Sequence, residues 1–307
     1  KKPSDSVQER AGLVELLALR ILNRRYQEEA VTPERPFTRA SVSRGQSYHA
    51  VRMTTLSVGF LPEQWRTALA AAERMRLSIL ATGVTQDELD RAATEFRASL
   101  EQRVDSAATR PSRAIVNSII QAMDENEVFT SDARDLEAFD AYVKDLKPDE
   151  VNHALRAAFA GGGPLIFAAG EAPFEGGEDA VRAVYLDAQK AAPSVLAQGA
   201  AKPWPYTAFG TPGKVVATRE AADVGATYLR FANGVKLTVR PSSLRANQVQ
   251  VSVKVGDGRL GLPRDRSTAA WASGAVVSGG LKQMTSTEIS RALSGRQYVA
   301  SFGIGED

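Results

Sequence analysis

The first half of the chain repeats hydrophobic residues at helical spacing. Between residues 7 and 28, Leu13, Leu17 and Ile21 lie four positions apart, and charged residues occupy the opposite face. This pattern predicts a long amphipathic helix. The same reasoning predicts further helices over residues 62–82, 85–104, 112–126, 131–146 and 148–159.

Local signals mark two of these helix ends. Gly83 follows the 62–82 run, as a glycine at a helix C-terminus does. Thr85 and Glu88 have the spacing of a capping box, in which each side chain accepts a hydrogen bond from the other residue's backbone N–H. A new helix is therefore predicted to begin at this point.

Alternating apolar and polar residues predict strands elsewhere. Asn233 and Gly234 separate two such runs and predict a type I′ hairpin, because Asn-Gly tolerates the two positive φ angles of that turn. Valines at every second position predict a half-buried strand over 249–255. The full set of predicted strands is 37–43 and 50–58 around a turn at 45–47, then 165–169, 228–231, 235–240, 249–255 and an apparent strand at 298–302.

Residues 171–224 differ from both flanks because Pro and Gly punctuate them. One Ala-rich stretch, 179–190, predicts a helix inside this connector. Trp204, Tyr206 and Phe209 are unfavourable in a free tether, so we expect this part to lie against a domain.

Length and charge narrow the class of protein. The 307 residues are enough for two domains with sizeable cores. Lys+Arg 38 against Asp+Glu 36 leaves the charge nearly balanced, and the basic residues are scattered, so we expect no nucleic-acid partner. The short clusters Arg24-Arg25 and 264–266 are interpreted as solvated faces. No apolar run is long enough to span a bilayer.

Metal-binding residue types are scarce. The chain has no cysteine and two histidines, His49 and His153, which are far apart in sequence and are interpreted as structural or surface residues. Ser267, Ser273 and Ser278 have no histidine near them in sequence, which argues against a serine nucleophile. The missing cysteines fit an exported bacterial protein, so we expect a periplasmic location, with the cytoplasm as the alternative.

Residues 267–281, STAAWASGAVVSGGL, precede the helix-start signal Thr285 to Glu288. This layout resembles the metal-binding region of the pitrilysin/insulysin family of zinc metallopeptidases, whose helix carries an inverted H-x-x-E-H motif. In the resemblance, the five motif positions fall on Ala270, Trp271, Ala272, Ser273 and Gly274. None of these side chains replaces a histidine ligand or the glutamate base, so we predict no catalytic, metal or cofactor site in this chain.

A broader set of motifs, in order, resembles the non-catalytic domain of the same family. The set comprises V-T-x-x-E-L at 84–89, S-A-A-T-R-P-S at 106–112, K-P-D-E-V at 147–151 and L-I-F-A-A-G at 165–170. The connector motif F-G-T-P-G-K at 209–214 and residues 231–237, F-A-N-G-V-K-L, resemble the inter-lobe linker and the opening of a second lobe.

The resemblance implies an α+β fold, with an antiparallel sheet backed by helices. It implies a non-catalytic domain at 1–172, an inter-lobe linker at 173–225 and the first part of a second-lobe domain at 226–307. The chain starts without Met and ends within the apparent strand 298–302, so we expect an internal segment of a longer polypeptide. The parent is expected to be a bacterial zinc endopeptidase with its zinc in the absent first domain.

The implied role is to line the chamber that encloses a peptide or unfolded polypeptide. The implied partners are that substrate, the absent domains of the same polypeptide and a second copy of the chain, because exposed strand edges favour self-association; which residues bind substrate stays open. Two alternatives also remain open. One is an inactive scaffold or binding subunit of the same fold, of the processing-peptidase or respiratory-complex type, and the other is a helical adaptor joined to an unrelated β domain.

Overall fold

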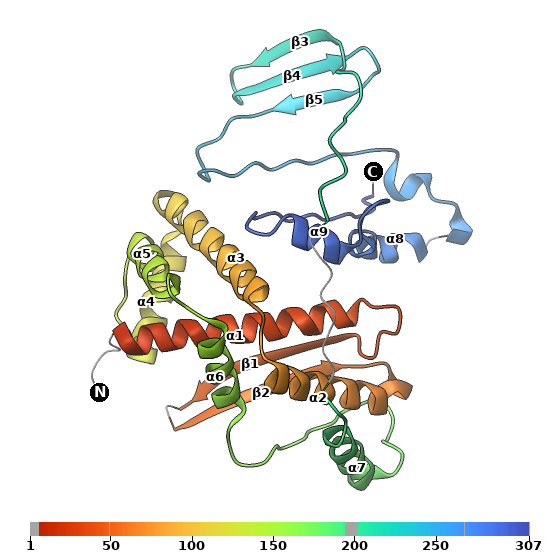
Figure 1. Cartoon of the computed structure of the whole chain (residues 1–307). Helices are drawn as coiled ribbons and strands as arrows, with labels where there is room; N and C mark the ends of the chain where they lie inside the picture. Colours follow the sequence, from red (N-terminus) through yellow and green to blue (C-terminus); the bar gives the residue numbers. More distant parts are fainter. Residues whose placement is uncertain (1–5, 49, 194–201, 267, 307) are drawn as a thin grey trace. The chain divides into compact units, whose positions relative to one another are not determined.

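The computed structural model describes residues 6–48, 50–193, 202–266 and 268–306, and its chain divides into two compact units (Figure 1). The first unit comprises residues 1–99 and 122–199, and the second comprises residues 100–121 and 200–307. Helices and small antiparallel sheets make up the described residues, so the predicted α+β class is confirmed. None of the described helices is long and apolar enough to cross a membrane.

The N-terminal part of the chain is mainly helical. Its elements are α1 (Ser6–Ala30), β1 (Arg39–Ser47), β2 (Val51–Gly59), α2 (Trp65–Thr82), α3 (Gln86–Asp105), α4 (Ser112–Glu125), α5 (Asp132–Val143), α6 (Pro148–Phe159) and α7 (Gly177–Gln189). All seven helices were predicted to within three residues at each end.

The hydrophobic core of the first unit is built around α1. This helix contacts β1, α2 and α6, and Figure 1 shows it lying along the β1–β2 hairpin. On its inward stripe, Leu17, Ile21 and Leu22 are each at most 1% exposed. Tyr26 extends the stripe, and its hydroxyl donates to the Ala72 carbonyl oxygen at 3.0 Å. Each such apolar side chain contributes about 1.5–3 kcal/mol through burial.

The β1–β2 hairpin is antiparallel, with pairs running from Arg39↔Gly59 to Ser47↔Val51. Ala40 and Val42 are buried, so one face of the hairpin covers the core and alternate residues face outward. The predicted turn at 45–47 is wrong, because those residues continue the ladder and the chain reverses between Ser47 and Val51. Tyr48, with φ 51°, supplies the left-handed conformation of that turn.

Three predicted strands are wrong, namely 165–169, 249–255 and 298–302. Each has the composition of a strand, but no described residue pairs with it as a strand partner. Leu165 is 101% and Val299 is 98% exposed, so these apolar segments lie in solvent. A strand needs a neighbour to satisfy its backbone, and local sequence does not supply one.

The second unit contains a three-stranded antiparallel sheet in the order β3-β4-β5. Its elements are β3 (Val215–Ala221), β4 (Ala226–Phe231), β5 (Lys236–Val239), α8 (Thr268–Ala272) and α9 (Ser286–Ala292). Strand β3 lies in the range interpreted as linker, where the sequence analysis predicted no strand. The boundaries 172 and 225 themselves remain a prediction.

The β4–β5 turn differs from the predicted type I′. Gly234 has φ 88°, but Asn233 does not have a positive φ. The Phe231 N–H donates to the Val235 carbonyl oxygen at 2.9 Å, which closes a longer loop. The geometry matches a three-residue hairpin connection whose last residue is left-handed, a role that glycine fills at no steric cost.

The connector aromatics mostly lie against the second unit, as predicted. The Gln283 N–H donates to the Tyr206 hydroxyl at 2.9 Å, and the rings of Trp204 and Tyr206 pack edge to face with centroids 5.6 Å apart. Lys202 Nζ donates to the Gln283 carbonyl oxygen at 2.9 Å. Phe209 is an exception, because it is 90% exposed.

Candidate functional site

The five positions aligned with the inverted zinc motif do not share one helix. Helix α8 ends at Ala272, and Ser273–Ala275 form a 3₁₀ turn. Trp271 is 80% exposed. Two ligands at i and i+4 meet on one face only if the helix continues through both, and here it stops between them. The resemblance implied that these five positions lie on one helix, and this expectation is wrong. The local backbone therefore differs from the family motif, as the side chains do.

The residues at this position do not fit a zinc ion. The Ser273 hydroxyl donates to the Ala270 carbonyl oxygen at 2.8 Å, and the Ser278 hydroxyl donates to the Ala275 carbonyl oxygen at 2.7 Å. Both hydroxyls are thus engaged with their own turns. Ser267 lies outside the described residues. Over the described part of the chain, no three His, Cys, Asp or Glu side chains form a group able to hold a metal.

The two histidines stand apart from the motif region in the sequence. His153 is an exposed residue of α6, and His49 lies outside the described residues. That this chain holds no catalytic or metal-binding residue remains a prediction.

The helix-start signal after the motif is present. The Thr285 hydroxyl accepts from the Glu288 N–H at 3.2 Å, and Glu288 Oε2 accepts from the Thr285 N–H at 2.8 Å. The hydrogen bond from the Thr285 backbone lowers the pKa of Glu288, as does the charge of Lys202, although desolvation opposes the shift. This reciprocal pair caps α9 and fixes where the helix begins.

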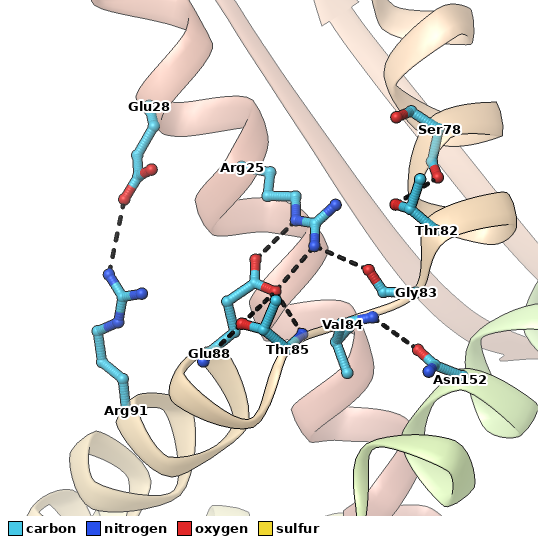
Figure 2. Close-up of polar contacts among 10 residues, drawn as sticks. All are labelled: Arg25, Glu28, Ser78, Thr82, Gly83, Val84, Thr85, Glu88, Arg91 and Asn152. Atoms are coloured by element: carbon cyan, nitrogen blue, oxygen red, sulfur yellow. Dashed lines mark hydrogen bonds and ion pairs between the residues drawn. The ribbon is translucent and has the colours of Figure 1, made fainter. Parts of the chain in front are cut away.

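A buried ion pair joins α1 and α3 in the first unit (Figure 2). Arg25 Nε donates to Glu88 Oε1 at 2.7 Å, and a terminal guanidinium nitrogen donates to Oε2 at 2.8 Å. The two side chains are 8% and 2% exposed. Two parallel hydrogen bonds between a guanidinium and a carboxylate are the strongest geometry for such a pair.

The ion pair also holds the turn between α2 and α3. The Arg25 guanidinium donates to the Gly83 carbonyl oxygen at 2.9 Å, and Glu88 Oε2 accepts from the Thr85 N–H at 2.8 Å. Asn152 of α6 accepts from the Val84 N–H at 2.8 Å. Figure 2 shows these contacts meeting at residues 83–85. Three helices are therefore tied to one turn.

The electrostatics of this pair favour its ionised form. Burial by itself raises the pKa of Glu88, but the hydrogen bonds from Arg25 and from the Thr85 backbone, together with the Arg25 charge, outweigh it and lower the pKa. The carboxylate is thus charged at neutral pH and completes its hydrogen bonds. Because the hydrogen bonds described for both side chains go to each other and to the turn at 83–85, we interpret the pair as structural.

The sequence predicted the Thr85 and Glu88 part of this cluster but not the burial of Arg25. The capping box of Thr85 and Glu88 was predicted and is confirmed. The interpretation of Arg24-Arg25 as a solvated cluster is wrong for Arg25, which is 7% exposed. A signal was present, since Arg25 lies four positions after Ile21 on the apolar stripe of α1.

An apolar recess of about 730 Å³ lies within the first unit, beside α7. Its walls come from the extended residues 164–168 and from one face of α7. We call it the α7 recess, and its lining includes Leu165, Phe167, Phe174, Val181, Tyr185 and Leu186. No backbone hydrogen bond joins residues 164–168 to another described residue. A concave apolar surface beside free backbone groups suits an extended peptide.

Comparison with solved structures gives the fold. The periplasmic protease PqqL from Escherichia coli matches with TM-score 0.54 and 15% identity, over 95% of this chain and 33% of that chain. The first half of the same protease matches with TM-score 0.51 and 14% identity, over 64% of this chain and 43% of that one. A predicted insulinase-family protease from Yersinia pestis matches with TM-score 0.49 and 13% identity, over 61% and 41%.

The chain has a pitrilysin/insulysin-type fold. At these identities the likeness concerns the fold alone. The chain spans about one third of the length of PqqL. No family model matches the sequence. No curated protein matches it either.

Proposed function

We propose that this chain is a non-catalytic segment of a zinc-dependent endopeptidase and lines the chamber that encloses a polypeptide substrate. One observation carries the proposal: nearly all of the chain, 95%, aligns with one third of a protease of this fold. An alignment that covers almost all of this chain but only one third of the protease supports the interpretation of the chain as a section of such an enzyme. The activity of the whole enzyme would then reside outside this chain.

The extent of the two alignments supports a position across the boundary between two lobes. PqqL as a whole matches 95% of this chain, whereas its first half matches 64%. A chain that runs from the first lobe into the second is expected to match the whole protease over more of its length than the first half alone. This agrees with a domain from the first lobe, a linker and the opening of the second.

The α7 recess supports a role in holding substrate. Unfolded polypeptides offer extended backbone and intermittent apolar side chains, and the recess offers an apolar surface beside unpaired backbone at 164–168. Binding of this kind needs few specific side chains, which agrees with the weak sequence signal.

In this proposal, zinc is bound by the parent polypeptide and not by this chain. Residues 270–274 offer no ligand and the helix is interrupted among them, so hydrolysis is assigned to a first domain outside this chain. The proposed location is the periplasm. PqqL is a periplasmic protein, and the cysteine-free composition suits that compartment.

Two measurements on the 307-residue chain test the proposal. Zinc content after dialysis against micromolar zinc, and cleavage of a fluorogenic casein, should both be at background. Stoichiometric zinc with casein cleavage would overturn the non-catalytic assignment.

The chamber role is tested by fluorescence anisotropy of a labelled, unfolded casein peptide. We expect saturable binding that Leu186→Asp in the α7 recess weakens several-fold. Leu244→Asp is the matched control, because Leu244 is 76% exposed and lies outside the recess. Absence of binding, or equal loss in both variants, would refute the recess as a substrate surface.

A further inference from the structure

Helix α7 is attached to the first unit by few apolar side chains. It packs against α2, and Figure 1 shows it beside that helix. Of its 13 residues, Val181 and Ala188 are buried, whereas Leu186 is 47% exposed. Helix α1, by contrast, buries a full stripe in the core cluster. Because burial of apolar surface is the main force that holds a helix in place, α7 should be held much less firmly than α1.

An aromatic contact joins the start of α7 to α2. The Phe174 ring packs edge to face on Trp65 with centroids 5.3 Å apart, and its centroid lies 6.2 Å from that of Phe60. Trp65, the first residue of α2, is 8% exposed. Beside this contact, the Arg66 guanidinium donates to the Glu175 carbonyl oxygen at 2.9 Å. Since the Arg66 contact is exposed and contributes little, Phe174 provides most of the attachment at this end.

The other end of α7 lies against a buried ion pair whose two members both belong to α2. Glu73 is 3% exposed and accepts two hydrogen bonds from Arg76, at 2.6 and 2.8 Å. From α7, Gln189 Nε2 lies 3.4 Å from Glu73 Oε1 and donates to the Tyr185 hydroxyl at 2.6 Å. If α7 left α2, Glu73 would keep its partner Arg76. Departure of α7 would therefore leave no buried charge alone, which is the outcome that makes breaking an ion pair costly.

Two consecutive glycines lie at the start of α7. Gly176 has φ 80° and Gly177 has φ 58°, so both are in the left-handed region. No side chain caps the helix at Gly176. Because glycine changes its backbone conformation at little steric cost, this pair lets the chain direction change between Phe174 and the helix.

We propose that residues 174–189, which we call the α7 latch, open from α2 as one unit while the core of the first unit stays folded. A free helix of this length is marginal in water, so α7 would lose its helical hydrogen bonds when it leaves α2. One face of α7 forms a wall of the α7 recess, and opening would therefore remove the recess. The opening does not depend on the peptidase role, whereas control of peptide binding by the latch rests on the proposed function.

Hydrogen exchange measured by mass spectrometry tests the opening in the free chain. Peptides from 177–189 should exchange several-fold faster than those of α1. Phe174→Ala should accelerate exchange along the whole of α7 by a further several-fold and leave α1 unchanged. Phe167→Ala is the matched control, because Phe167 lines the other wall of the recess and is 92% exposed. It should change neither helix.

Two results would overturn the latch. Equal acceleration of α1 and α7 by Phe174→Ala would mean that α7 opens only when the whole unit unfolds. Acceleration confined to the last turn of α7 would mean that the helix end frays and the latch does not open as one unit.

Trypsin gives an independent measurement, because a protease cuts within a helix only after the helix opens. Arg182 is an exposed residue of α7 and precedes Ala183. Cleavage after Arg182 should be several-fold faster in Phe174→Ala than in Phe167→Ala. Equal cleavage rates in the two variants would contradict the proposal.

The labelled casein peptide, added at saturating concentration, tests control of the recess. A peptide held in the recess should slow exchange of α7 several-fold and leave α1 unchanged. Saturable binding with unchanged exchange of α7 would overturn this control. Failure of the peptide to bind would refute the substrate role of the recess and this control with it, whereas the exchange data on the free chain would still decide whether the latch opens.

Discussion

At the scale of single residues, the ion pair of Arg25 and Glu88 is a buried polar contact that stabilises the first unit. Both groups have lost their water, and each satisfies the other. Removing one partner leaves a buried charge alone, which costs far more than the pair itself contributes. Substituting either partner alone is therefore expected to lower the free energy of unfolding strongly. Substituting both should cost much less than the sum of the two single substitutions.

Arg25→Met should lower the free energy of unfolding by about 3–5 kcal/mol, because it strands the Glu88 carboxylate in the core. The double variant Arg25→Met/Glu88→Gln should lose less than the sum of the two single variants. Urea denaturation measures all of these values. Arg97→Met is the matched control, since its pair with Asp140 is about 43% exposed, and it should cost under about 1 kcal/mol. Equal losses at Arg25 and Arg97 would contradict this account.

The same carboxylate makes stability depend on pH. The pKa of Glu88 is lower in the folded chain than its usual value, which is about 4.3 when the chain is unfolded. Its contribution is therefore present above that value and is lost as the pH falls through the folded pKa. The stability gap between the unmodified chain and Glu88→Gln should be widest near pH 7 and shrink below about pH 4. A gap that widened on acidification would show that the sign is wrong.

At the scale of elements, Gly83 decides where α2 ends and lets α3 begin beside α6. Its φ of 77° and ψ of −172° lie where residues with a side chain are strained. A Cβ at this position would meet Asn152 Nδ2 at 2.6 Å. That contact would disturb the amide that accepts from Val84.

Gly83→Ala should lower the free energy of unfolding by about 2 kcal/mol or more, from backbone strain and from displacement of Asn152. Chemical denaturation measures the change. Gly161→Ala is the control, because a Cβ there meets nothing within 4 Å and its φ is not positive. It should change stability by less than about 1 kcal/mol. Similar effects at both glycines would exclude strain at Gly83 as the cause.

Elements were predictable where their cause is local. The start of α3 follows from Thr85 and Glu88, and the end of α2 follows from Gly83, because these residues act on their own backbone. Strands were predictable only where a neighbour stood close in sequence, as for β1 and β2. The 165–169 and 249–255 runs carry the strand pattern but have no strand partner among the described residues. The burial of Arg25 was missed for the same reason, since its partner lies 63 residues away.

At the scale of the whole molecule, the two units differ greatly in how much apolar surface they bury. Of the buried apolar side chains in the described residues, three belong to the second unit, namely Leu100, Ala226 and Met284. The remainder lie in the first unit, mostly in one cluster that runs from Val14 to Leu155. Because burial of apolar surface is the main favourable term in folding, the first unit should be much the more stable.

Limited trypsin digestion should therefore cut first in the second unit. Arg245 is exposed and follows β5, and it precedes Ala246, so we expect early cleavage there. Arg20 and Arg24 of α1 should resist, because cutting them requires the core cluster to open. Mass spectrometry of the first products decides between these sites. Calorimetry should show a small transition before the main one. Tryptic cleavage within α1 as fast as cleavage after Arg245 would mean that burial does not govern which unit opens first.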